Sequence, residues 1–315
     1  MREPPHVYRR RRATALGLLA GVLILLMLAA RSCGGATEPT TLQSQANIAA
    51  PVPPPQLPRG GRRVFPDFRV VAFYGAPQSR QLGTLGIGRP SQMAKRLQRV
   101  ARAYSRKTRP VLPAFELIST IAAAAPGADG LHRMHQPDEV IDRYLRAARK
   151  AKALLVLDIQ PGRADFLSEA IRLERWLREP DVGIALDPEW HVGPNEIPGQ
   201  VIGSMTAEKV NEVSAYVSKF VEEHNLPEKL FVVHQFTSGM IVGKERVVRR
   251  PGLAVTMNVD GFGDRPNKVS KYDEFTSELA RFHDGFKLFY EEDTNLMQPR
   301  QVLALGPPPD LVVYE

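Results

Sequence analysis

Short apolar runs, rich in β-branched and aromatic residues, alternate with amphipathic stretches along most of the chain. Eight such runs recur at intervals of roughly 25 to 45 residues, at 69–75, 111–118, 153–160, 182–190, 229–236, 253–260, 286–293 and 311–315. The amphipathic stretches cover 92–105, 137–151, 164–178, 206–224 and 271–284. Continuous apolar strands separated by helices are typical of a parallel sheet that is covered on both faces. The chain is therefore predicted to be an α/β protein, with an eightfold β/α (TIM) barrel over residues 65–315.

A doubly wound open sheet is the alternative to the barrel. Such sheets usually contain fewer strands and often open with a glycine-rich phosphate loop directly after a strand. The nearest segment is Gly83–Gly88, which lacks the Gly-x-Gly-x-x-Gly spacing and lies several residues beyond its strand. The pattern therefore favours the closed barrel.

The positive charge of the chain is concentrated near its start. Residues 1–63 hold nine arginines against two glutamates, which accounts for seven of the eight net positive charges. We therefore exclude nucleic acid as a partner of the folded part. Residues 1–12 are predicted to be a basic cytoplasmic tail. The uncharged run 13–30 is predicted to be a transmembrane anchor or signal segment, which would place the rest outside the cytoplasm, membrane-anchored or secreted.

Residues 34–64 are rich in Gly, Thr, Ser, Gln and Pro and are predicted to form a disordered Pro-rich linker. Cys33 is the single cysteine, which excludes an internal disulfide and a cysteine-based metal cluster. It stands where the lipidated cysteine of a bacterial lipoprotein would stand, although Ala30 and Arg31 fit a lipobox poorly.

Polar side chains stand at the C-terminal end of nearly every predicted strand, where barrel enzymes build their active sites. Carboxylates that are buried close together cost free energy unless they are paired, protonated or bound to a cation. We therefore expect these strand ends to bind a substrate. The predicted contact residues are Tyr74, Glu116, Asp158, Trp190, His234, Gln235, Asp260 and Tyr290.

Asp187 and Glu189 end the fourth predicted strand. Two-residue alternation places both side chains on one side of the strand, with Pro188 opposite. The charge of Asp187 and the apolar surface of Trp190 would raise the pKa of Glu189, which would make it a general acid near neutral pH. In the alternative interpretation, Asp187 caps the following turn and Glu189 pairs with an arginine.

The segment Val182–Glu189 resembles the fourth-strand signature of the family 18 glycoside hydrolases, the chitinase-like barrels, which is Asp-Gly-x-Asp-x-Asp-x-Glu. Valine and alanine replace its first two aspartates. The segment Met257–Asp260 is similar to the Met-x-Tyr-Asp segment of that family, with valine in place of the tyrosine. The resemblance implies that Glu189 is the catalytic acid, Asp187 its partner and Asp260 a contact to the sugar.

The resulting prediction is an extracytoplasmic glycoside hydrolase that acts on a cell-envelope or environmental polysaccharide without a cofactor or metal. In a conventional arrangement of two carboxylates, Glu189 would be the acid/base and Glu291 the nucleophile.

Two alternatives stay open. A non-catalytic carbohydrate-binding barrel of the cell envelope is favoured by the two missing aspartates. A metal-dependent hydrolase would draw its ligands from Asp158, Asp187, Glu189, His234 and Asp260.

Overall fold

The computed structural model describes residues 53–277 and 281–315 and contains all eight predicted strands. They are parallel and pair in the order β1-β2-β4-β5-β7-β9-β10-β11. β11 pairs in turn with β1, so the sheet is a closed β/α barrel and not an open doubly wound sheet. The strands are β1 (Arg69–Gly75), β2 (Val111–Ala122), β4 (Leu154–Ile159), β5 (Val182–Leu186), β7 (Lys229–Gln235), β9 (Leu253–Val259), β10 (His283–Leu288) and β11 (Leu311–Tyr314).

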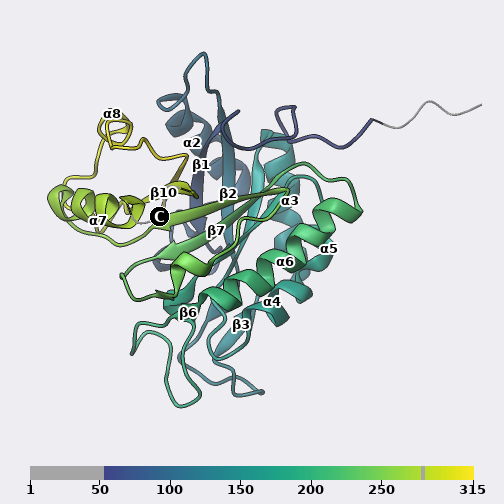
Figure 1. Ribbon diagram of the computed structural model, residues 1–315, viewed down its shortest axis with the longest axis vertical. Coiled ribbons are helices and arrows are strands. Elements are labelled where there is room, and N and C mark those ends of the chain that lie inside the picture. Colours follow the sequence, from purple (N-terminus) through teal and green to yellow (C-terminus); the bar gives the residue numbers. More distant parts are fainter. Residues whose placement is uncertain (1–52, 278–280) are drawn as a thin grey trace, which may run out of the picture. The chain divides into compact units, whose positions relative to one another are not determined.

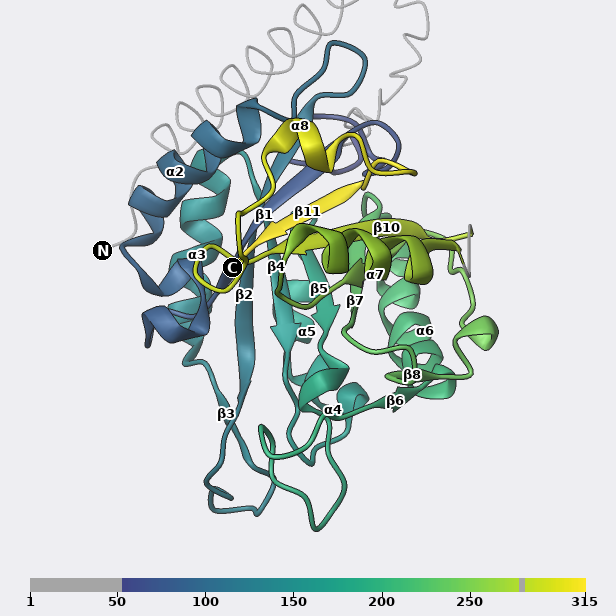
Figure 2. The ribbon, with the colours of Figure 1, turned by 90° about the vertical axis from the view of Figure 1, so that its left-hand side faces the viewer.

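Helices surround the barrel (Figure 1). They are α2 (Pro90–Arg102), α3 (Asp138–Ala151), α4 (Phe166–Arg172), α5 (Glu174–Leu177), α6 (Ala207–Glu223), α7 (Arg265–Ser277) and α8 (Pro299–Val302). Figure 2 shows α2 and α3 side by side along the barrel, while α6 lies apart from them near α4. Three short strands are not among the eight barrel strands. They are β3 (Arg133–His135), which pairs antiparallel with β2, and β6 (Met205–Thr206) and β8 (Ile241–Val242), which pair with each other.

The seventh helix and strand lie earlier in the chain than the sequence pattern predicts. The helix was expected over 271–284 and the strand over 286–293, but α7 begins at Arg265 and β10 spans His283–Leu288. The Asp264 side chain accepts a hydrogen bond from the Asn267 backbone N–H at 3.0 Å, and proline follows Arg265, so an N-cap starts the helix here. As a consequence, Tyr290 and Glu291 lie beyond the strand and not at its end.

Two-residue alternation divides each barrel strand between the helix-covered outside and the lumen. The lower lumen is filled by small and branched apolar side chains, which form one buried cluster. The strand residues of this cluster that fill the lower lumen are Val70, Ala72, Leu112, Ala114, Leu154, Val156, Ala185, Leu230, Val232, Ala254, Leu311 and Val313. One step further along each strand, the same parity places polar side chains in the upper lumen. The barrel is therefore a packed core below and a polar site above.

The segment before β1 covers the N-terminal end of the barrel. Leu57, Val64, Phe65 and Phe68 are buried in the same cluster as the lumen residues. The Arg62 guanidinium fixes this segment by donating to the backbone carbonyl of Leu226 at 2.8 Å, just before β7. Residues 53–64 of the linker predicted over 34–64 therefore belong to the folded unit, and the rest of that prediction lies outside the described residues.

The predicted basic tail 1–12, the apolar segment 13–30 and Cys33 lie outside the described residues. Within residues 53–277 and 281–315, none of the helices combines the length and the apolar character that crossing a bilayer requires.

Gly183 lies in β5 where that strand approaches β7 closely. A Cβ atom at this position would lie 2.6 Å from the backbone oxygen of Leu230, a separation that side chains do not adopt. We expect Gly183→Ala to lower the free energy of unfolding by about 1 to 3 kcal/mol, because the strand pair must move apart. Urea denaturation measures this change.

Gly239→Ala is the matched control, because nothing lies within 4 Å of a Cβ atom there. The loss of unfolded-state entropy is the same for both variants and cancels in the comparison. Equal urea midpoints for the two variants would contradict a close strand contact at Gly183.

Candidate active site

The upper lumen is lined by a polar side chain from each barrel strand or from the residue that follows it. All are buried except Glu315, which is partly exposed. In strand order they are Tyr74, Glu116, Asp158, Asp187, His234, Asn258 with Asp260, Lys287 and Glu315. This ring stands at the C-terminal ends of the strands, as the sequence predicts.

Lys287 is the central cation of this ring. Its Nζ donates to Asp260 Oδ2 at 3.1 Å and to Glu315 Oε2 at 2.7 Å, and it lies 3.8 Å from the centre of the Tyr74 ring. Burial disfavours the ammonium, but Asp260, Glu315 and Asp187 outweigh this and raise the pKa of Lys287 well above its usual range. Burial disfavours the ionised form of Asp260, but Lys287 and His234 outweigh this effect and lower the pKa of Asp260.

His234 lies between two carboxylates. Its Nδ1 is 3.0 Å from Asp260 Oδ2 and its Nε2 is 2.9 Å from Glu116 Oε1. Burial lowers the pKa of the imidazole, yet its hydrogen bonds to Asp260 and Glu116 raise that pKa well above its usual range. His234 therefore compensates two carboxylates at once.

Tyr74 connects the ring to two further carboxyl groups. Its hydroxyl accepts a hydrogen bond from Gln160 Nε2 at 2.9 Å and lies 3.1 Å from Asp158 Oδ2 and 3.4 Å from Asp187 Oδ2. Burial is the main cause that raises the pKa of both Asp158 and Asp187. The upper lumen therefore contains two kinds of carboxyl group. The negative charge of Asp260 is compensated by neighbouring cations, whereas burial favours the protonated forms of Asp158 and Asp187.

Glu189 follows β5 in a short 3₁₀ turn, Pro188–Trp190. Burial and the charges of Asp187 and Asp260 raise its pKa to about 8, so the carboxyl is mostly protonated at neutral pH. The alternative roles are not seen in the described residues, since Asp187 makes no capping hydrogen bond and Glu189 has no ion pair with an arginine.

A cavity of about 250 Å³ opens above the polar ring. Asp187 and Glu189 both line it, as predicted, although the turn and not strand alternation places Glu189 there. Its aromatic walls are Trp190, Phe236, Phe262 and Phe289, and its polar lining is completed by Tyr74, Gln81, Gln160, Asp260, Lys287, Glu292 and Glu315.

Six predicted site residues do not line this cavity. Glu116, Asp158 and His234 belong to the buried polar ring beneath it. The other three are Glu291, Tyr290 and Gln235. Glu291 is half-exposed and accepts a hydrogen bond from Arg80 Nε at 2.9 Å. Tyr290 packs outside the barrel, stacked on Tyr314 at a centroid distance of 5.1 Å. Gln235 is buried on the opposite face of β7 from His234. Glu291 and Tyr290 were misplaced because β10 ends at Leu288.

Lys287 is the functional residue that the sequence analysis missed. The signal was present, because Lys287 is a single cation within the apolar segment Phe286–Phe289. A lysine buried in a barrel strand needs hydrogen-bond acceptors, and Asp260 next to the neighbouring strand is one of them.

The five metal ligands predicted for a metal-dependent hydrolase do not converge on one point. Asp260 is engaged by Lys287, and Glu189 lies in the turn above. The group that the described residues do bring together is Glu116, Asp158 and His234, which offer one ligand atom each within 4.8 Å of one another. None of these three lines the cavity.

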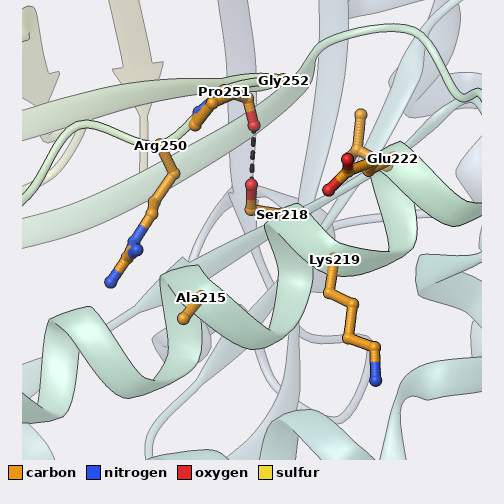
Figure 3. Close-up of a pocket in the computed structure, with 8 residues that line it drawn as sticks. Ala215, Ser218, Lys219, Glu222, Arg250, Pro251 and Gly252 are labelled. Carbon is orange, nitrogen blue, oxygen red and sulfur yellow. Dashed lines mark hydrogen bonds between the residues drawn. The ribbon is translucent and has the colours of Figure 1, made fainter.

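A second hollow, of about 470 Å³, lies between the end of α6 and the loop before β9 (Figure 3). Ser218 Oγ donates to the backbone oxygen of Pro251 at 2.8 Å across it. It lies at the N-terminal end of β9, away from the polar ring, and is therefore not part of the candidate active site.

No family model matches the chain, and no curated protein matches it. Among solved structures, the chain is similar to an oxaloacetate acetylhydrolase in complex with its product oxalate, with 11% identity, 79% of this chain and 75% of that chain covered, and a TM-score of 0.46. It is also similar to a sialic acid aldolase of Ruminococcus gnavus, with 13% identity, 79% and 68% coverage, and a TM-score of 0.38. A third is the spore coat polysaccharide biosynthesis protein spsE of Bacillus subtilis, with 12% identity, 78% and 59% coverage, and a TM-score of 0.41, so the chain spans about three fifths of that protein.

The predicted membership of the family 18 glycoside hydrolases is wrong. No family model supports it, and the similar structures above are an acetylhydrolase, an aldolase and a biosynthesis protein. Two of the matching residues have packing reasons, because Gly183 allows the approach of Leu230 and Met257 is buried in the outer core. The glycoside hydrolase function that rested on this resemblance and on Glu291 is wrong as well.

Replacing Lys287 by methionine should destabilise the barrel strongly. The change leaves Asp260 and Glu315 buried without their cation, which costs about 3 to 5 kcal/mol of unfolding free energy. Lys271→Met is the control, because Lys271 is only partly buried and its Nζ lies 4.3 Å from the Phe236 ring centre. That contact is worth about 0.5 to 1 kcal/mol. Similar urea midpoints for both variants would contradict a central role of Lys287.

The raised pKa of Glu189 predicts a pH-dependent contribution to stability. The folded protein holds this proton up to about pH 8, whereas an unfolded glutamate releases it near 4.5. The contribution is therefore complete below pH 4.5 and is lost as the pH rises towards 8. Relative to Glu189→Gln, the wild type should lose unfolding free energy across this window.

Denaturant titrations at several pH values measure this difference. Glu291→Gln serves as the control, because that carboxylate is half-exposed. If the unfolding free energies of the wild type and of Glu189→Gln changed in parallel between these pH values, Glu189 would ionise in the folded protein as it does in the unfolded chain.

Proposed function

We propose that the barrel is an enzyme of the hydrolase class that uses carboxyl acid–base chemistry on a small substrate bearing hydroxyl or amino groups. The observation that supports this proposal is that one cavity contains a protonated and an ionised carboxyl group. Glu189 is mostly protonated at neutral pH, and Asp260 is held ionised by Lys287. Groups whose environments push their pKa values apart are suited to act as acid and base.

Glu189 is the general acid in this proposal. Its carboxyl donates a proton to the leaving oxygen or nitrogen as the bond to the substrate breaks, while a water molecule forms the new bond and passes a proton to the ionised Asp260. Asp260 and Asp187 line the same cavity, and their negative charge stabilises positive charge that develops on the substrate. Lys287 keeps Asp260 ionised through their 3.1 Å contact and is a positioning residue.

The lining of the cavity favours a neutral or cationic substrate. The Lys287 ammonium already donates to Asp260 and Glu315 and faces the Tyr74 ring, so it offers little to an anion. The carboxylates accept hydrogen bonds from hydroxyl or amino groups. The aromatic walls of Trp190 and Phe262 cover an apolar face of the ligand. A volume of about 250 Å³ fits a small molecule or one terminal group of a larger one.

The alternative is a non-catalytic binding barrel. It predicts that Glu189→Gln leaves ligand binding unchanged and that no substrate is turned over. A glycan partner and an extracytoplasmic location remain predictions, because the segment 13–30 lies outside the described residues.

The test is a series of chromogenic esters, amides and ethers of hydroxylated and amino compounds, with leaving groups of graded acidity, incubated with the full chain. Glu189→Gln should lose about 10²- to 10⁴-fold in rate on substrates with basic leaving groups. The loss should be much smaller on nitrophenolate leaving groups, which depart without a proton.

Glu291→Gln is the matched control and should keep the wild-type rates, because its carboxylate lies outside the cavity. Equal losses on good and poor leaving groups would contradict general acid catalysis by Glu189. If ligands bind without turnover and Glu189→Gln leaves that binding unchanged, the non-catalytic alternative is correct.

A further inference from the structure

A second polar group lies beneath the cavity floor and takes no part in the proposed hydrolysis. Glu116, Asp158 and His234 contribute one possible ligand atom each, and these atoms all lie within 4.8 Å of one another. Each side chain is at most 1% exposed. Tyr74 separates the group from the cavity, since its ring lines the cavity and its hydroxyl lies 3.1 Å from Asp158 Oδ2.

One oxygen of this group lacks a partner. Asp158 Oδ1 is buried and makes no hydrogen bond within the described part of the chain, and it lies 3.9 Å from His234 Nε2. A buried carboxylate oxygen in this position costs free energy unless a cation, a proton or a water molecule binds it.

The orientation of His234 is that of a metal ligand. Its Nδ1 lies 3.0 Å from Asp260 Oδ2, so Nδ1–H donates to a carboxylate and Nε2 is directed at Glu116 and Asp158. Histidines that bind metals usually donate their other ring N–H to a carboxylate in this way. Lys287 in turn fixes that carboxylate through Asp260 Oδ2.

We propose that Glu116 Oε1, Asp158 Oδ1 and His234 Nε2 bind one divalent transition-metal cation, which displaces the proton from Nε2 into solvent. Two carboxylate oxygens and one imidazole nitrogen suit Mn²⁺ or Zn²⁺ better than Ca²⁺, which takes oxygen ligands only. The ion lies below Tyr74 and does not touch the substrate. It fixes the positions of Asp158 and Tyr74, and through them the floor of the cavity.

The test measures binding without turnover. The full chain is treated with a chelator, dialysed against Mn²⁺ or Zn²⁺ and analysed for bound metal, and isothermal titration gives the affinity. We expect one equivalent per chain and a rise in Tm with metal concentration. Co²⁺ in the same site should give the absorption bands of an imidazole-bound ion. No stoichiometric metal and no change in Tm at ~1 mM free Mn²⁺ or Zn²⁺ would overturn the proposal.

Asp158→Asn should weaken binding by at least ~10- to 100-fold. Glu169→Gln is the matched control, because Glu169 is a buried carboxylate whose partners are Arg133 and His135, away from the ligand atoms. It should keep wild-type affinity even where it lowers Tm. Equal affinities of Asp158→Asn and the wild type would also overturn the site. Glu189→Gln should bind the metal normally, which separates this proposal from the proposed hydrolysis.

Discussion

The upper lumen of this barrel depends on the ammonium group of Lys287. A carboxylate taken out of water costs several kcal/mol unless an opposite charge or hydrogen bonds replace its hydration. Lys287 lies within hydrogen-bonding distance of both Asp260 and Glu315, from the strands on either side of it. One cation thereby joins three neighbouring strands by charge as well as by backbone pairing.

The same cation explains why the carboxyl groups of the cavity differ from one another. Asp260 receives hydrogen bonds from Lys287 and from the Gly261 backbone N–H at 2.7 Å, so its negative charge is stabilised. Glu189 is held by burial and by the charges of Asp187 and Asp260, so it retains its proton. Two carboxyl groups thus acquire different chemistry from their burial and from the charged groups around them.

Much of this arrangement could be predicted from sequence, because apolar periodicity determines which segments are strands and two-residue alternation determines which side chains face the lumen. The strands and the place of Asp187 followed from these rules, whereas a 3₁₀ turn and not alternation places Glu189. The end of β10 could not be predicted, because the apolar residues continue past Leu288. Its start could not be predicted either, because the N-cap Asp264 begins α7, and therefore the strand after it, earlier than the apolar pattern indicates. Glu291 was therefore placed in the site in error.

Two further errors have a different reason: the role of Lys287 was missed, and the family prediction was wrong. A lysine in a strand usually faces solvent, so its burial is visible only when Asp260 and Glu315 are known to be its neighbours in space. Gly183 matched a catalytic signature, but the residue is required by the approach of Leu230. Short motifs in barrel strands contain packing residues and functional residues together, and the sequence does not separate the two.

The segment that covers the N-terminal end of the barrel also determines how molecules reach the cavity. Val64 and Phe68 close the lumen from below, and apolar side chains fill its lower half, so the cavity has no passage through the barrel axis. A ligand of the cavity therefore enters and leaves on the side away from the packed lower lumen. A bound ligand must leave before the next one can enter.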